Sequence, residues 1–305
     1  AREAIIIGPR APDQPGAIRA PSDWVWALGR TLVSGPEDLA AAHLVQDGLA
    51  ATGAAGRFPL VAPRRTAPWP EFLAGVQALL ADTPPPPTDA RLLTASAAAG
   101  LLQDKVFDPG RFSPDQGAQI AAGLAEALEI ARQGDEAGER RGGWLYPKPN
   151  LGRFGQDYRH RAQIALSGLA ALPADEALYL RALSPDGRSE LDSRRPWRLR
   201  LPANALPPVD GFWSLTIYEV KPHGQAFLID NPLQRYAIGD RTPGISGARG
   251  DIDILISPTA PAGVQQATWL PAPTSGRPFL LSFRAYRPRP AMLGGDYRLP
   301  SLQPA

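Results

Sequence analysis

The chain has 305 residues, of which 44% are apolar and 20% are charged, a composition that excludes a disordered chain and allows two domains of ordinary size. Its 32 basic and 30 acidic residues leave a net charge of +2, which is too balanced to predict binding to nucleic acid or to an anionic membrane. The absence of cysteine excludes disulfides and thiolate chemistry, and 30 glycines with 35 prolines exclude a mostly helical chain.

The first segment, residues 1–62, predicts short strands and one helix. A β-branched run at Ile5–Ile7 stops at Gly8-Pro9, and the apolar run Trp24–Gly29 is typical of a buried strand. Ser34, followed three residues later by Glu37, predicts a capping box. The apolar residues that follow it at helical spacing are Leu39, Ala42, Val45 and Leu49. Because the chain begins within a strand and shows no export signal, we expect a fragment or a processed product.

The second segment, residues 63–143, predicts helices separated by loops. Pro70 opens one helix, prolines 84–87 form a stiff spacer, and a second helix runs from about Thr88 to Leu102. Ser113-Pro114-Asp115-Gln116 predicts a capping box for a third helix. The polar, glycine-rich stretch 133–143 then marks a boundary. No apolar run approaches the roughly 20 residues that a membrane span needs.

The third segment, residues 144–305, predicts one helix over Gln156–Leu172, with Ala162, Ala165 and Leu169 among its inward residues, and then strands. Apolar and polar residues alternate along 197–201, 213–218, 252–256 and 279–284. Half-buried strands without intervening helices predict an antiparallel, jelly-roll-like β-sandwich. The fold class is therefore α+β, mainly β, with a helical middle segment.

The common catalytic and cofactor motifs are missing. The chain has no nucleophile elbow, phosphate loop, dinucleotide fingerprint or His-Glu-x-x-His helix. Asp251 and Asp253 share a strand face and could bind Ca²⁺, but a solvated strand face is the favoured interpretation because no further oxygen ligands can be identified. The three scattered histidines, His43, His160 and His223, receive no catalytic role. We expect no metal and no cofactor.

A first polar cluster surrounds Tyr158. Arg153, Asp157 and Arg161 are spaced four residues apart, so on a helix they stack along one side. They form either a cationic clamp for a carboxylate or phosphate, or a structural Arg–Asp–Arg ladder that joins the helix to the sheet. The ladder is the favoured interpretation.

A second cluster runs from Asp210 to Tyr218 behind a proline-rich entry. Alternation places Phe212, Ser214, Thr216 and Tyr218 on one face, a mixture that suits a wet pocket wall. The opposite face, which begins with Trp213, is the core face. A pocket and a plain sheet surface remain equal alternatives for the polar face.

A third cluster lies between turns at Asp230-Asn231-Pro232 and Gly239-Asp240-Arg241, where a short strand carries Arg235 and Tyr236. These residue types indicate either a polar site or a buried network that satisfies loop backbone. The candidate pocket residues from the three clusters are Arg153, Asp157, Tyr158, Arg161, Asp210, Trp213, Tyr218, Asn231, Arg235, Tyr236, Asp240 and Arg241.

Together these segments resemble a bacterial pair of domains of unknown function, numbered 1254 and 1214. The second domain is carried by five segments that follow in the right order, 152–162, 206–216, 231–241, 269–273 and 284–288. For the first domain, only its C-terminal end is matched, by Trp26–Val33 with Asp38 and His43. Gln156 and Gln234 depart from the asparagine that relatives commonly carry.

The resemblance implies two jelly-roll β-sandwich domains with a helical insert, in a protein that is often exported and often oligomeric. Residues 1–62 would then be an incomplete N-terminal β domain, 63–143 a helical link and 144–305 the C-terminal sandwich. We expect a periplasmic or secreted protein; since the chain shows no signal peptide, a cytoplasmic location is the alternative. The resemblance supplies no catalytic residue.

Two functions remain as alternatives. One is a pocket in the C-terminal sandwich for a small polar or anionic ligand; as an enzyme it would use Asp240 or Asp210 with a tyrosine for hydrolysis or proton transfer. The other is a non-catalytic assembly or surface-interaction protein. We expect a homo-oligomer, or pairing with a chain that supplies missing N-terminal strands, and neither a nucleic-acid partner nor a membrane span. The sequence does not decide whether the protein is an enzyme.

Overall fold

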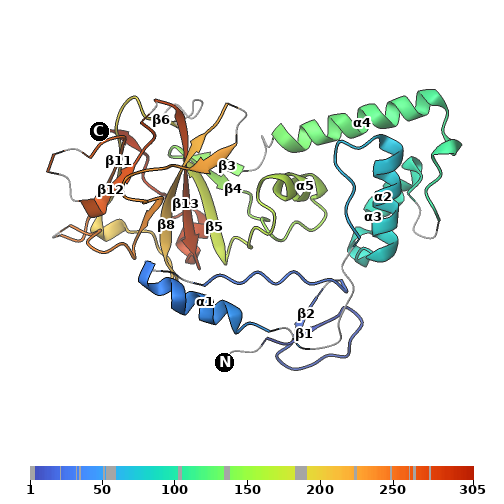
Figure 1. The fold of residues 1–305 in the computed structure, drawn as a ribbon, viewed down its shortest axis with the longest axis horizontal. Helices are drawn as coiled ribbons and strands as arrows, with labels where there is room; N and C mark the ends of the chain where they lie inside the picture. Colours follow the sequence, from blue (N-terminus) through green and yellow to red (C-terminus); the bar gives the residue numbers. More distant parts are fainter. Residues whose placement is uncertain are drawn as a thin grey trace. The chain divides into compact units, whose positions relative to one another are not determined.

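The computed structural model describes the chain except residues 1–3, 21, 32, 34–35, 51, 53–59, 102–104, 134–137, 183–190, 223–224, 248, 261, 264–265 and 275. The chain divides into two compact units, residues 1–129 and 130–305. Helices predominate in the first unit and strands in the second (Figure 1). The predicted α+β class is confirmed, whereas the jelly-roll topology and the domain bounds at residues 62 and 143 stay predictions.

The first unit carries most of the helices. A parallel strand pair, β1 (Ile6–Ile7) and β2 (Ile18–Arg19), comes first. The helices follow as η1 (Pro36–Asp38), α1 (Leu39–Asp47), α2 (Trp69–Asp82), η2 (Pro87–Asp89), α3 (Ala90–Ser96), η3 (Ala97–Ala99), η4 (Pro109–Arg111) and α4 (Pro114–Gln133). The capping box at α4 is confirmed: Ser113 Oγ accepts from the Gln116 N–H at 3.3 Å, and Gln116 Oε1 accepts from the Ser113 N–H at 2.9 Å. Ser34 and His223 lie outside the described residues.

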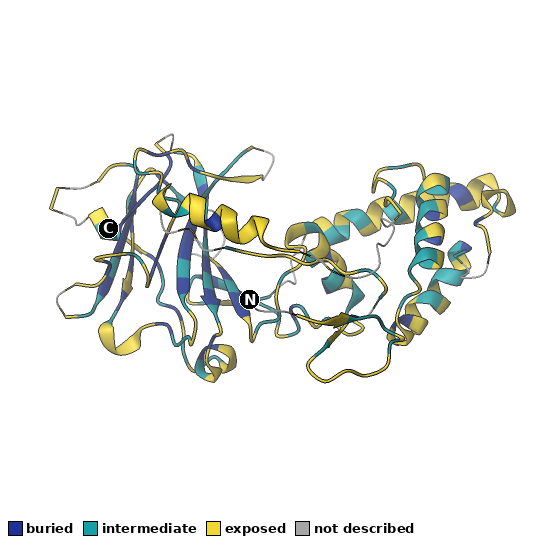
Figure 2. Ribbon diagram, turned by 60° about the horizontal axis from the view of Figure 1, so that its bottom comes forward, coloured by how far each residue is buried: buried dark blue, intermediate teal, exposed yellow. Residues whose placement is uncertain are grey.

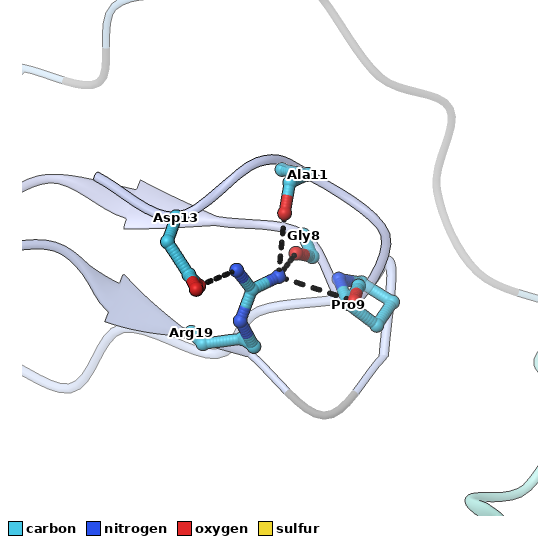
Figure 3. Close-up of polar contacts among 5 residues, drawn as sticks. All are labelled: Gly8, Pro9, Ala11, Asp13 and Arg19. Atoms are coloured by element: carbon cyan, nitrogen blue, oxygen red, sulfur yellow. Dashed lines mark hydrogen bonds and ion pairs between the residues drawn. The ribbon is translucent and has the colours of Figure 1, made fainter.

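The loop between β1 and β2 is organised around one guanidinium group (Figure 3). Arg19 Nη1 donates to the carbonyl oxygens of Gly8, Pro9 and Ala11 at 3.0, 3.1 and 2.8 Å, and Nη2 pairs with the Asp13 carboxylate. Charge-assisted bonds of this kind are the stronger ones in proteins. A side chain of β2 therefore holds the loop in shape.

The predicted buried strand at Trp24–Gly29 is wrong. The described residues of this run form no strand, and Val25, Trp26 and Leu28 are 53%, 65% and 58% exposed. A short apolar run becomes a buried strand only where a neighbouring strand pairs with it, and none of the described residues supplies one here. Helix α1 also leaves apolar side chains exposed: it buries Ala42, whereas Leu44 and Val45 remain exposed.

The second unit contains two sheets. In the large sheet the order is β10, β8, β13, β5, β4, β3, with β9 paired to β8 and β6 paired to β13, and every pair is antiparallel. Its strands are β3 (Gly138–Arg141), β4 (Trp144–Pro147), β5 (Ala177–Ala182), β6 (Leu191–Asp192), β8 (Trp213–Val220), β9 (Ala226–Leu228), β10 (Ala237–Gly239) and β13 (Pro278–Tyr286).

The small sheet has the order β12, β11, β7, β14, and its β11–β12 pair is parallel. Its strands are β7 (Trp197–Leu201), β11 (Ile252–Ser257), β12 (Trp269–Pro271) and β14 (Gln303–Pro304). The second unit is completed by α5 (Tyr158–Ser167), η5 (Ala203–Ala205), η6 (Gln266–Thr268) and α6 (Pro290–Gly294).

Both sheets contribute to one hydrophobic core, because their strands alternate as the sequence predicts. Along β13, for example, Phe279, Leu281 and Phe283 are buried and the residues between them are half-buried. The Trp213 ring stacks on Phe283 with centroids 5.4 Å apart. Figure 2 shows buried residues along the strands of this unit. Each such side chain contributes about 1.5–3 kcal/mol to the stability of the fold.

Helix α5 is shorter than predicted, and its buried face is different. Asp157 caps it at the start and it ends at Ser167, whereas the sequence predicted Gln156–Leu172. The expected inward face is wrong: Ala162 and Ala165 are exposed, and Leu169 lies beyond the helix. The buried residues are His160 and Gln163. Small alanines gain little from burial, so they did not determine which face packs inward.

Candidate functional site

The predicted Arg–Asp–Arg ladder does not form. Because α5 begins at Tyr158, Arg153 precedes the helix and makes a two-pronged ion pair with Asp175, at 2.6 and 3.1 Å. Both side chains are at least half exposed. Arg161 instead lies over the Tyr158 ring, 4.8 Å from its centroid. These contacts bind the segment to itself and to the residues before β5.

Asp157 serves as the N-cap of α5. Its carboxylate accepts hydrogen bonds from the His160 N–H at 3.1 Å and from Asn150 Nδ2 at 3.2 Å, and Lys148 Nζ lies 3.7 Å away. The backbone bond from His160 is the main cause that lowers the pKa of this carboxyl, so Asp157 is ionised at neutral pH. This is a structural role that satisfies an otherwise free N–H at the helix end.

The third cluster is a network that fixes a loop. The Asn231 side chain is buried; its Nδ2 donates to the carbonyls of Ile229 and Arg235 at 3.0 Å each, and its Oδ1 accepts from the N–H groups of Leu233 and Arg235 at 3.2 and 3.0 Å. Within this loop Gln234 has a φ of +49°, a conformation that asparagine tolerates better than glutamine.

Arg235 also satisfies backbone. Its Nη1 donates to the carbonyl oxygens of Gln266 and of Trp269, the latter at 3.0 Å, and so joins the loop to the start of β12. Tyr236 continues β10 through its carbonyl, which accepts from the Ile217 N–H at 3.0 Å. The buried-network interpretation of this cluster is the one these bonds support.

Residues at one end of β8 and β13 form a second group of contacts. Asp240 Oδ1 accepts from the Trp213 N–H at 3.3 Å, and desolvation raises the pKa of its carboxyl. Arg241 lies 4.0 Å from the centroid of the Phe212 ring, which in turn stacks on Tyr286 at 4.3 Å. Asp210 at the same end pairs with Arg289 at 2.8 Å.

Strand β8 separates two of the predicted pocket residues. Trp213 faces the core, whereas Tyr218 lies on the outward face, because side chains alternate along a strand. The hydroxyl of Tyr218 accepts from Arg284 Nη2 at 2.8 Å, and Thr216 Oγ1 accepts from Arg284 Nη1 at 2.7 Å. Arg284, which the pocket prediction did not include, therefore links the hydroxyl groups of Thr216 and Tyr218 on the polar face of β8.

The strand register places more hydroxyl groups around this arginine. Arg284 lies directly opposite Ser214 on β8 and Tyr179 on β5, and Ser282 lies opposite Thr216. Directly opposed residues project to the same face of a sheet. We call Arg284, Ser214, Thr216, Tyr218 and Ser282 the Arg284 cluster.

The Arg284 cluster carries an uncompensated positive charge. Arg284 is half-buried, and within the described part of the chain no carboxylate lies within ion-pair distance of it. Two of its five N–H donors point to hydroxyl oxygens, which leaves three donors, among them Nε–H. A partly buried charge without a counter-ion favours binding of an anion.

The twelve predicted pocket residues fall into several separate groups of contacts. Trp213 contacts Asp240, Asn231 contacts Arg235, and Tyr158 contacts Arg161. Arg241 bonds to the Asp240 carboxylate through its backbone N–H, and the Asp157 carbonyl accepts from the Arg161 N–H at 3.0 Å. Other members bond to residues outside the predicted set, such as Asp175 for Arg153. The predicted pocket as a whole stays a prediction.

Asp251 and Asp253 pair with arginines of the neighbouring strand β7, Arg200 at 3.6 Å and Arg198 at 3.5 Å. Over the residues that the structure describes, no group of three or more metal-binding side chains occurs. Among the same residues, no helix has the length and apolar character of a membrane span.

Comparisons with known proteins identify two families. Residues 176–290 match the family described as "Protein of unknown function (DUF1214)", and residues 1–53 match "Protein of unknown function (DUF1254)". The Arg284 cluster lies entirely within the DUF1214 match, whereas the segment around Tyr158 precedes it. No curated protein matches the chain.

Two solved structures are similar to this chain. The VPA0106 protein from Vibrio parahaemolyticus has a TM-score of 0.60 at 22% identity, over 90% of this chain and 67% of its own. An uncharacterized protein from Burkholderia cenocepacia has a TM-score of 0.30 at 17% identity, over 65% of this chain and 43% of its own. The first likeness supports the fold. The chain thus carries a partial match to DUF1254 followed by a match to DUF1214, in that order.

Proposed function

We propose that the second unit binds a small organic anion, a carboxylate or a phosphate ester, on the outward face of its large sheet. The observation that carries this proposal is Arg284, whose guanidinium is held in place by Thr216 and Tyr218 and has no carboxylate partner among the described residues. An arginine fixed in this way loses little conformational freedom when it binds a ligand.

The chemistry of the Arg284 cluster selects for acceptors. Thr216 and Tyr218 already accept from the guanidinium, so each hydroxyl hydrogen is free to be donated to a ligand. The hydroxyls of Ser214 and Ser282 share the face. A group that only accepts, such as a carboxylate or a phosphate, matches this set of donors better than an amide or an alcohol does.

The carboxyl groups considered for acid–base chemistry are engaged elsewhere. Asp210 pairs with Arg289, and Asp240 accepts from the Trp213 backbone. A general base must lie within hydrogen-bond reach of the proton that it takes. These contacts therefore favour binding without a reaction over hydrolysis.

Isothermal titration of the full chain with phosphate, citrate and acetate tests the proposal, with acetamide as the uncharged counterpart of acetate. We expect at least one anion to bind and acetamide to fail. Arg284→Gln should weaken that binding at least tenfold, and Thr216→Val should weaken it less. Arg200→Gln is the matched control, because Arg200 is an exposed arginine on β7 of the small sheet, away from the Arg284 cluster. Equal binding by the Arg284 variant and the control would refute the site.

A second candidate, self-association, is favoured by a different observation. In the first unit Trp26, Leu44, Val45 and Leu49 are each more than half exposed although they are large and apolar. Contiguous exposed apolar surface marks an interaction site in soluble proteins. We propose that this surface is covered in a homo-oligomer. Light scattering of the purified chain should give at least twice the 32.6 kDa monomer mass, and a stable monomer would exclude this candidate.

A further inference from the structure

Helix α5 packs through an unusual polar face. Its two buried residues, His160 and Gln163, are 0% and 2% exposed and lie three residues apart, so they share one side of the helix. Buried polar groups are normally hydrogen-bonded, and each exception calls for an explanation. Neither role proposed above uses these residues.

The hydrogen bonds fix the protonation of His160. The Asp157 carboxylate can only accept at neutral pH, so Asn150 must turn its NH₂ toward Asp157, at 3.2 Å. Asn150 then presents its Oδ1 to His160 Nδ1 at 3.0 Å. Because an amide oxygen only accepts, Nδ1 carries the proton and Nε2 of the neutral ring carries the lone pair.

The other ring nitrogen has no place for a second proton. His160 Nε2 is buried, and no described protein group lies within hydrogen-bond distance of it. The Phe154 ring packs edge-to-face on the imidazole at 5.1 Å. The charged groups that act on the ring are Lys148 and Asp157 from the preceding loop, and Lys148 opposes protonation. An imidazolium here would be a buried charge with an unsatisfied donor.

We infer that the loop 148–157 and α5 form a proton-sensitive latch, which is closed while His160 is neutral and opens when Nε2 takes up a proton. Closing joins Asp157, Asn150 and His160 in one chain of hydrogen bonds across the helix start. Opening exposes the imidazolium to water and releases the N-terminal turn of α5.

The pH range follows from the two states of the ring. Burial lowers the pKa of His160 in the closed state, whereas the open state has the ordinary value near 6.5. The open state therefore binds more protons below that pH, and the closed latch loses stability as the pH falls. Its opening constant should rise between pH 7.5 and pH 5.5, by about tenfold at most. Asp157 remains ionised throughout this range, since its pKa lies below its ordinary value.

Hydrogen exchange of the α5 amides in the full chain tests the latch. Protection factors, which remove the intrinsic pH dependence of exchange, should fall from pH 7.5 to pH 5.5, by about tenfold at most. The variant His160→Phe keeps a ring but cannot take a proton, so its α5 protection should be equal at the two pH values. His43→Gln, which changes an exposed histidine on α1, should behave as the wild type.

A direct titration of His160 by NMR covers the case in which the phenylalanine variant does not fold. We expect a midpoint below 6.5 for His160 in the wild type. A midpoint at or above that value, an α5 protection that does not change with pH, or a full pH dependence in His160→Phe would each overturn the latch.

Discussion

Replacing Asn231 by alanine should strongly destabilise the second unit. The substitution removes four hydrogen bonds to backbone groups, in a position that is 8% exposed. At a net value of roughly 1 kcal/mol per bond, with some of the freed groups reaching water, the loss is about 3 kcal/mol. This is a substantial part of the 5–15 kcal/mol that stabilises a typical domain.

The assay is hydrogen exchange of peptides from β8 and β13, which follows the second unit by itself. A loss of about 3 kcal/mol should accelerate their exchange by roughly 100-fold. Asn204→Ala, at an exposed asparagine in η5, is the matched control and should leave exchange unchanged. Exchange within threefold of wild type in Asn231→Ala would show that this side chain does not fix the loop.

Three further predictions concern neighbouring features of the second unit. Arg235→Met should lower the melting temperature and accelerate exchange in β12, because the Gln266 and Trp269 carbonyls lose their donor; anion affinity per folded molecule should not change. Gln234→Asn should raise the free energy of unfolding by about 0.5 kcal/mol, measured by urea denaturation, since asparagine accepts the positive φ more readily. Glu219, whose pKa is lowered chiefly by its bond from Lys221 and also by Arg277, contributes stability above its ordinary value of 4.5 that is lost as pH falls through its lower folded value. Glu219→Gln should flatten the stability profile between pH 5 and pH 3, and an unchanged slope would contradict the assigned pairs.

The strands of the second unit could be predicted because their signal is local. Side-chain character alternates along 197–201, 213–218, 252–256 and 279–283, and this alternation predicts which side of each strand is buried. The structure buries the residues that the alternation places inward. The capping box at Ser113 is equally local. The buried strand predicted at Trp24–Gly29 was wrong because burial there depends on a partner strand, and an apolar run does not show whether one is present.

The Arg284 cluster could not be predicted, because it depends on register between distant strands. Arg284 meets Thr216 and Tyr218 across a sequence separation of 66 residues or more. The alternating run 279–284 indicated that Arg284 points away from the core. Alternation does not show which residues of another strand lie opposite it, so the partners of Arg284 could not be predicted. Arg153 and Asp157 were misplaced for a related reason: the ladder needed a helix over both, and the Asp157 cap starts the helix after them.

The central claim is that Arg284 contacts a bound anion, and the NMR signal of its Nε–H group tests this most directly. Titration of the isotopically labelled chain with phosphate, citrate or acetate should shift the Arg284 Nε–H resonance to saturation with at least one of them, while the signal of Arg200, on β7 of the small sheet, remains in place. An Arg284 signal that does not move with any of the three, or that moves only in parallel with Arg200, would contradict the account.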